Sequence, residues 1–304
     1  MMNTKTVVGA LASLSLVLAT SGCDLTKQAQ AKTVAVSTIL TTPNIDIKAE
    51  ALASNGLDAS IPSFDGGFDA GILGDAGILL TDAGITIPAQ NLAFVYLGQR
   101  QGESLDVAPM GVPGAAARLI QVGGPSFTLE DQGSGNYALS PDAGFVYTDD
   151  ATYQFEFKVQ TQTYVAEVAH VPSRETIAAF HPPAGYIELE AGTEFTFTRP
   201  DPPGGTDRNF GFVNVFPVSQ SGQGQPTYTN IPMTPLAFLK LIAFPQEWKS
   251  TQVTIPGTAF PNKDSNYVIV LQSAKLGGPK SDNLFAGSAI LAGTAEVAIV
   301  KTKK

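Results

Sequence analysis

The most constraining feature of this sequence is a strict alternation of apolar and polar residues near its middle. Residues 153–159 read Tyr-Gln-Phe-Glu-Phe-Lys-Val, so every second side chain is apolar and the side chains between them are polar. A period of two is that of a β-strand with one buried face. Residues 163–169 continue the pattern as an antiparallel partner after a short polar turn. Such a hairpin needs further strands to cover its apolar face, which predicts a β-sheet protein.

The rest of the chain repeats this theme in short segments. Hydrophobic residues make up 43% of the 304 residues, which is ample for a packed core, and 30 Gly and 21 Pro residues break the chain often. Short strands between such breaks predict an all-β sandwich or barrel. One short helix is expected at residues 234–242, where Thr-Pro opens a run with helical apolar spacing. The strands are expected at residues 33–40, 92–97, 186–190, 194–198, 210–216, 253–255, 267–271 and 295–300.

The charge and the cysteine content exclude several classes of protein. The formal charge is −9 and the pI about 4.7. Such a field repels phosphate backbones, so no nucleic-acid partner is expected. One Cys and two His exclude a disulfide framework and a closed Cys/His zinc site. No cofactor motif is present in the sequence, and we expect no cofactor.

The first 23 residues have the pattern of an export signal. Lys5 supplies a positive charge, and residues 7–19 are an apolar run that is too short to span a bilayer. Thr20-Ser21-Gly22-Cys23 follows, and Cys23 is the only cysteine. The segment resembles the lipobox of bacterial lipoproteins, although Thr20 stands where that family usually has Leu. The resemblance implies cleavage before Cys23, acylation of its thiol and of its new amine, and a stable membrane anchor.

The main alternative is ordinary signal cleavage after residues 29–31, which read Ala-Gln-Ala. That site lies far beyond the apolar run, and a free thiol is a liability in an exported protein, so we favour the anchor. The expected location is the bacterial cell envelope, with the outer membrane or cell surface favoured over the periplasmic face of the inner membrane. The membrane is therefore one expected partner.

A Gly/Ala/Asp-rich stretch at residues 53–84 repeats the sequence Asp-Ala-Gly-Ile. Each Asp-x-Gly has the composition of a turn. Spaced carboxylates also raise the alternative of a calcium site, but calcium needs more closely grouped oxygen ligands than this repeat offers. We therefore interpret the stretch as a linker or insertion loop. The carboxylates of the calcium alternative are Asp65, Asp69, Asp75 and Asp82.

A weak duplication suggests two similar units. Asp-Ala-Thr-Tyr at residues 150–153 and Asp-Ser-Asn-Tyr at residues 264–267 each precede an apolar run. The motif resembles the tyrosine corner of immunoglobulin-like and fibronectin type III sandwiches, in which a Tyr hydroxyl bonds to backbone upstream. The resemblance gives that role to Tyr153 and Tyr267. The antibody Cys pair is absent, and Trp248 does not stand where those domains place their core Trp.

These features predict two tandem immunoglobulin-like antiparallel β-sandwiches, with the short helix in the second. Residues 192–198 resemble an early core strand of a fibronectin type III domain, and the joint is expected at residues 171–174. The expected segments are a signal peptide at 1–22, a polar tether at 23–32, a strand plus linker or insertion at 33–87, a first sandwich at 88–172 and a second at 173–304.

We found no catalytic motif in the sequence. It contains no Gly-x-Ser-x-Gly, His-Glu-x-x-His, P-loop or Rossmann pattern, and we assign no catalytic residue. His170 and His181 are interpreted as ordinary surface or joint histidines. The acidic pairs at residues 149–150 and at Glu188 and Glu190 are interpreted as solvated charge, although carboxylates can also pair across space in glycosidases.

Exposed aromatic residues are the remaining candidates for ligand contact. Trp248 and Tyr228 lie in the irregular part of the second sandwich and could stack on a sugar. Packing in the core or at a sheet edge is the favoured interpretation of both. The chain resembles bacterial lipoproteins with tandem immunoglobulin-like domains. We expect a non-catalytic anchored module for binding, adhesion or scaffolding with an envelope or extracellular protein partner. A glycan-binding lipoprotein is the alternative, and an enzyme with a cryptic carboxylate site is the third.

Overall fold

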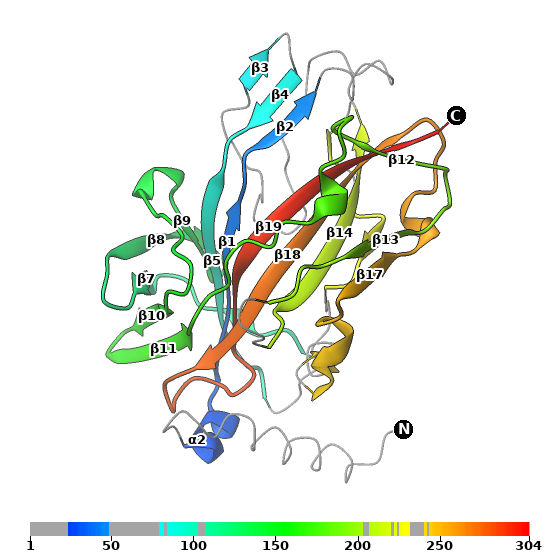
Figure 1. Ribbon diagram of the computed structural model, residues 1–304. Coiled ribbons are helices and arrows are strands. Elements are labelled where there is room, and N and C mark those ends of the chain that lie inside the picture. Colours follow the sequence, from blue (N-terminus) through cyan, green and yellow to red (C-terminus); the bar gives the residue numbers. More distant parts are fainter. Residues whose placement is uncertain are drawn as a thin grey trace, which may run out of the picture.

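The computed structural model is an all-β protein, as the alternation predicts (Figure 1). It describes residues 24–48, 79–81, 84–102, 107–202, 207–219, 222–223, 225–231, 240–241 and 243–303. A short α-helix, α2, covers Leu25–Gln30, and 3-10 turns lie at Pro141–Ala143, Ala178–Phe180, Pro245–Glu247 and Gly257–Ala259. The strands are β1 Thr33–Thr42, β2 Ile45–Lys48, β3 Leu79–Thr81, β4 Gly84–Ile87, β5 Gln90–Gln99, β6 Met110–Gly111, β7 Ala116–Gln121, β8 Ser126–Gly133, β9 Asn136–Leu139, β10 Tyr153–Val159, β11 Gln162–Val168, β12 Ile187–Leu189, β13 Phe195–Thr198, β14 Phe210–Ser219, β15 Gly222–Gln223, β16 Tyr228–Thr229, β17 Gln252–Ile255, β18 Asn266–Pro279 and β19 Ala289–Thr302.

The alternating segment forms the predicted hairpin of β10 and β11. Tyr153 lies opposite Val168 and Val159 lies opposite Gln162. Tyr153, Phe155 and Phe157 are fully buried, whereas the polar residues between them are more exposed. The period-two pattern therefore fixes both the strand and the face that it turns to the core.

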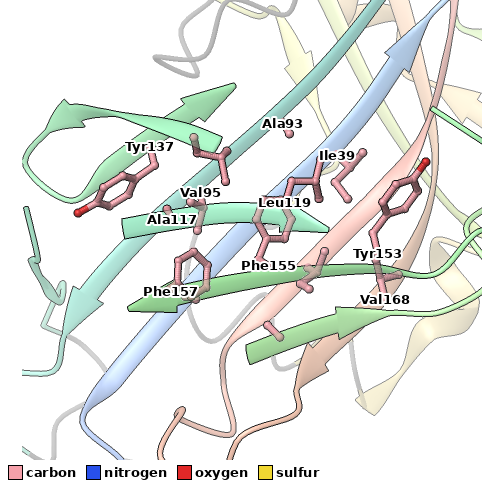
Figure 2. Close-up of a cluster of buried hydrophobic side chains, with 14 of the residues drawn as sticks. Ile39, Ala93, Val95, Ala117, Leu119, Tyr137, Tyr153, Phe155, Phe157 and Val168 are labelled. Carbon is pink, nitrogen blue, oxygen red and sulfur yellow. The ribbon is translucent and has the colours of Figure 1, made fainter. Parts of the chain in front are cut away.

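A closed ring of strands surrounds the first core. Its order is β1, β5, β9, β8, β7, β10 and β11, and the ring closes because β11 pairs with β18, β18 with β19, and β19 with β1. Figure 2 shows side chains from these strands pointing toward one another. The first core contains Ile39, Leu97, Leu119, Tyr137, Phe155, Phe157, Leu284, Ile290 and Ala292, among others.

The second core lies between two sheets. One sheet runs in the order β12, β19, β18 and β14, and the other is the β13–β17 pair. Phe197 of β13 and Ile255 of β17 belong to the same buried cluster as Val213, Tyr267 and Val300 of the larger sheet. Two sheets that bury a common cluster form a β-sandwich.

One long hairpin belongs to both cores. Strands β18 and β19 have 14 residues each and pair from Asn266–Lys301 to Gly277–Ile290. The last three residues of β19, 300–302, pair with β12, whereas residues 289–294 pair with β1 of the first ring. In Figure 1 this hairpin runs along the molecule from one core to the other. The first core takes Leu284, Ile290 and Ala292 from beyond residue 173, where the sequence analysis places the start of the second sandwich.

Both predicted tyrosine corners have the expected hydrogen bond. The backbone N–H of Thr148 donates to the Tyr153 hydroxyl at 2.8 Å, and that of Asn262 donates to the Tyr267 hydroxyl at 3.0 Å. The Asp that begins each motif has a positive φ, 59° at Asp150 and 47° at Asp264. The two motifs therefore share a backbone conformation as well as a sequence pattern.

The N-terminal part differs from the simple tether that the sequence suggests. Helix α2 lies within residues 24–32, and β1 follows it directly as a member of the first ring. Strands β2, β4 and β3 form a small separate sheet. Of the stretch expected as a linker or insertion at residues 53–84, residues 79–81 form β3 and Gly84 begins β4, whereas the four aspartates of the repeat lie outside the described residues. Of the helix expected at residues 234–242, Lys240 and Leu241 are described and are helical.

Candidate functional site

A group of charged and polar side chains lies where the chain passes from the first core to the second. Arg174 and Glu175 follow β11 and bind different parts of the second sandwich. Their partners come from β18, from β19 and from the residue that follows β13, and His181, after the 3-10 turn that ends at Phe180, shares one of these partners. We call this group the ionic joint; it consists of Arg174, Glu175, His181, Arg199, Ser273 and Glu296.

Glu296 is the buried carboxylate of the joint. It lies on β19 with its side chain 2% exposed, on the same face as Ala298 and Val300 of the second core. Arg174 Nε donates to Glu296 Oε2 at 2.7 Å, and His181 Nε2 contacts Glu296 Oε1. A buried carboxylate needs such partners, because the desolvation of an unpaired charge is costly. The joint therefore satisfies Glu296 from the segment between β11 and β12.

Arg199 is the buried cation of the joint. It follows the alternation of Phe195 and Phe197 on β13, which turns its side chain inward, and that side chain is fully buried. Its Nε and Nη2 donate to the two carboxylate oxygens of Glu175 at 2.8 and 2.7 Å. This bidentate geometry gives the strongest charge-assisted hydrogen bonds available to a protein ion pair.

Further partners complete the hydrogen bonding around Arg199. The backbone oxygens of Trp248 and Asn209 accept from Nη1 and Nη2 at 3.2 and 3.0 Å. Ser273 Oγ donates to Glu175 Oε1 at 2.6 Å. A Cβ at Gly211 would lie 2.6 Å from Arg199 Nη1, so only glycine leaves room for the guanidinium there.

This arrangement is suited to holding two parts of the chain together. Each carboxylate of the joint receives donors from two different elements, and both of its oxygens are used. Ser273 and Glu296 lie near the midpoint of the long hairpin, on opposite strands. The joint therefore fixes the segment after β11 to the place where the hairpin passes between the cores.

The aromatic candidates lie in packed positions. Trp248 Nε1 donates to the backbone oxygen of Asn230 at 2.8 Å, and its ring packs in a cluster with Phe210 and Phe212. Tyr228 packs against the second core, and burial, with a smaller contribution from Glu247, raises the pKa of its hydroxyl. Both side chains are half-buried, and they pack against different clusters.

The other candidate residues are exposed or fall outside the described part of the chain. Asp150 contacts His170 through Oδ1 and Nδ1 at 2.9 Å, with side chains 84% and 67% exposed. Glu190 Oε1 lies 3.1 Å from Lys303 Nζ. Cys23 and the four aspartates of the calcium alternative are outside the described residues. Within the described residues, no three His, Cys, Asp or Glu side chains are grouped closely enough to hold a metal ion.

The comparisons with known proteins add little. No protein-family model and no curated protein matches the chain. Among the 21 chains of solved structures that match is the native conformation of the alpha-2-macroglobulin of E. coli, at 12% identity and a TM-score of 0.21. The match covers 69% of this chain but only 13% of the macroglobulin. A superposition this loose supports no inference about shared fold or activity. Where the structure describes the chain, no helix is both long and apolar enough to cross a bilayer.

Proposed function

We propose that the chain is a lipid-anchored protein of the bacterial cell envelope that acts as a non-catalytic binding or scaffold module. The long hairpin common to both cores is the observation that carries this proposal. Because β19 contributes Ile290 and Ala292 to the first hydrophobic cluster and Ala298 and Val300 to the second, the two cores cannot move independently without distorting this strand. A body of this kind can hold a partner at a fixed distance and orientation from a membrane.

Two further observations support an immunoglobulin-like relationship, the first for the second unit alone and the second for both units. The sheet order β14, β18, β19 has the pairing of strands C, F and G, and the pair β13–β17 has that of strands B and E. The hydroxyls of Tyr153 and Tyr267 bond to backbone five residues upstream, as in a tyrosine corner. Such sandwiches commonly bind partners through edge strands and end loops.

The ionic joint supports a structural role in place of a chemical one for its own residues. Arg199 and Glu175 neutralise each other, and Arg174 and His181 both engage Glu296. Breaking a buried pair leaves an uncompensated charge, so the contacts resist hinge motion at the joint. This argues for rigid spacing between the ends of the molecule.

Crosslinking in the intact envelope tests the proposal. The full-length protein is crosslinked in its own cells, recovered by an affinity tag, and analysed by mass spectrometry. The matched control carries residues 1–32 of this chain on an unrelated domain, so it has the same signal and anchor. A protein recovered reproducibly with the full chain and not with the control supports a scaffold or binding role. Recovery of the same proteins by both chains contradicts it, and recovery of glycan alone favours the glycan-binding alternative.

A further inference from the structure

The segment that follows Cys23 is bonded to the body of the protein from its first described residue. The backbone N–H of Asp24 donates to Asp282 Oδ1 at 2.8 Å, and Asp282 lies in the loop between β18 and β19. The Asp24 carboxylate caps α2 by accepting from the N–H groups of Thr26 and Lys27 at 3.0 and 3.3 Å. The helix therefore begins at the surface of the long hairpin's tip.

Gln28 fixes the helix to the same loop. Its side chain is buried, and its Nε2 donates to the backbone oxygens of Ser281 and Pro279 at 3.2 and 3.5 Å. Its own backbone oxygen accepts from the N–H of Ala286 at 3.1 Å. A buried amide that bonds in this way costs stability when it is lost, so α2 is held in place and is not a loose leader.

The chain after the helix continues these contacts. The N–H of Phe285 donates to the oxygen of Thr33 at 2.7 Å, and the guanidinium of Arg100 lies 4.1 Å above the Phe285 ring. Leu284 is fully buried in the first core. The loop at residues 279–288 is therefore held by hydrogen bonds to the N-terminal segment and by packing against the first ring.

We propose that the end of the molecule formed by α2 and residues 279–288 is seated on the headgroup surface of the membrane. This inference rests on the proposed lipid anchor at Cys23. Cys23 is joined directly to the Asp24 amide, which is hydrogen-bonded to Asp282. The Cα atom of the acylated residue therefore lies one peptide unit, about 3.8 Å, from the Cα atom of Asp24. A free nine-residue tether would instead reach about 30 Å when extended. The lipid therefore holds this particular end of the protein against the bilayer.

The charges of this end indicate that the covalent anchor sets the seating, with no need for attraction to anionic lipid. Lys27 Nζ lies 3.4 Å from Asp24 Oδ2 and 3.6 Å from Asp282 Oδ2. The ammonium group of Lys280 contacts the Glu167 carboxylate. Cationic and acidic groups are thus nearly balanced, unlike the basic clusters that recognise anionic headgroups. We expect the seating to be the same on neutral and on anionic bilayers.

The opposite end of the hairpin then points away from the membrane. Strands β18 and β19 start and end beside Asp264 and Lys303, and a strand of 14 residues spans roughly 45 Å. Figure 1 shows α2 at one end of this hairpin and the C-terminus at the other. The end of the hairpin near Asp264 and Lys303 is therefore the end that is accessible to a partner.

Energy transfer to the membrane tests this orientation. The lipidated protein carries a donor dye on Asn283→Cys or on Lys263→Cys, both exposed positions at opposite ends of the hairpin. Because acylation occupies the thiol of Cys23, the added cysteine is the one that takes the dye. The proteins are reconstituted in phosphatidylcholine vesicles that contain an acceptor-labelled lipid. We expect several-fold stronger transfer from position 283 than from position 263, with no change when phosphatidylglycerol is added.

A matched control separates the seating from the anchor. Insertion of a nine-residue Gly/Ser linker between Cys23 and Asp24 keeps the helix contacts but should bring the two transfer efficiencies closer together. Equal transfer from both positions in the protein without the linker would overturn the proposed seating. Failure of the unlabelled protein to float with vesicles, although it is folded, would overturn the lipid anchor itself. A dependence of the difference on phosphatidylglycerol would overturn seating by the anchor alone.

Discussion

The two hairpins β10–β11 and β18–β19 begin alike and end differently. Each starts at an Asp with positive φ, followed by a buried Tyr whose hydroxyl accepts a backbone hydrogen bond. The first hairpin turns back at Gln160 after strands of 7 residues, whereas the second continues for 14. A tyrosine corner therefore determines where a hairpin starts but not how far it extends.

The length of the second hairpin is explained by the first ring. Without residues 275–294 the ring would be open between β11 and β1, and both strands would present an unpaired edge. Gly277 permits the close approach, because a Cβ there would lie 2.1 Å from the backbone oxygen of Glu167. The extra length thus serves the neighbouring core and not the hairpin's own.

The largest expected effect is at the ionic joint, whose buried Arg199–Glu175 pair contrasts with the exposed Arg118–Glu156 pair of the first ring. Arg199→Met keeps the side-chain length but leaves Glu175 without its bidentate partner, and we expect a loss of about 3–5 kcal/mol in the free energy of unfolding. Urea denaturation measures this loss. The matched control is Arg118→Met in the first unit, where the pair with Glu156 is exposed and about 0–1 kcal/mol is expected. Equal losses in the free energy of unfolding for the two variants would show that the buried pair contributes no more to stability than the exposed pair.

Leu284→Ala tests whether the second hairpin stabilises the first core. Leu284 is fully buried there, so we expect a loss of about 2–5 kcal/mol from the missing contacts and the cavity. Hydrogen exchange should become faster in β10 and β11, which belong to the other hairpin. The control is Asn283→Ala, an exposed neighbour that should change little. Faster exchange confined to β13 and β17 would place the effect in the wrong core.

The two corners should be equivalent. Tyr153→Phe and Tyr267→Phe each remove one hydroxyl and leave a backbone N–H without its acceptor, at a cost of about 1–3 kcal/mol. The edge-to-face contacts with Phe145 and Phe260 are retained in both variants. Thermal and urea denaturation of the two variants measure the costs. A large difference between the two losses of unfolding free energy would mean that the shared motif stabilises the two hairpins to different extents.

The smallest effect concerns pH at the contact between the hairpins. Partial burial raises the pKa of Glu167, but hydrogen bonds from Lys280 and Gln154 outweigh it, and the pKa is lowered from its ordinary value of 4.5. A carboxyl with a lowered pKa stabilises the folded chain above pH 4.5, and this stabilisation is lost as the pH falls through the lowered value. Lys280→Met should therefore be less stable than the parent protein at pH 7 and should approach it below pH 4.5. Denaturation midpoints across this range measure the difference, and a gap that widens in acid would contradict the assignment.

Local patterns predicted the hairpin of β10 and β11 and both Tyr hydroxyl contacts, but they did not predict β7, β8 and β9 of the first ring. The alternation at residues 153–159 gives the strand and its buried face, and the repeated Asp-x-x-Tyr gives the two hydroxyl contacts. The same rule also marks part of the ionic joint. Arg199 continues the inward row of Phe195 and Phe197, and Glu296 interrupts an apolar run, so each is a charge at a core-facing position. Such positions demand a partner, although the sequence does not say which.

The pairing across the chain could not be predicted in the same way. Glu175 and Ser273 meet through a contact between residues 98 positions apart, and Asp24 meets Asp282 across 258 positions. No periodicity encodes these distances, because they depend on how the two units come together. The short polar run at residues 24–32 likewise has the composition of a tether and becomes a docked helix only because the hairpin tip offers Gln28 its acceptors.

The closing of the first ring by the second hairpin also sets an order of events for the nascent chain. A chain that emerges from its amino end presents β1 and β11 long before residues 275–294 exist to join them. Contacts of such long sequence separation form slowly. Until they form, β1 and β11 each keep an unpaired strand edge that can pair with another chain. The hairpin tip of a second copy has the same sequence and could pair with the same two strand edges, so we expect reciprocal exchange between two copies to be the main risk of misassembly.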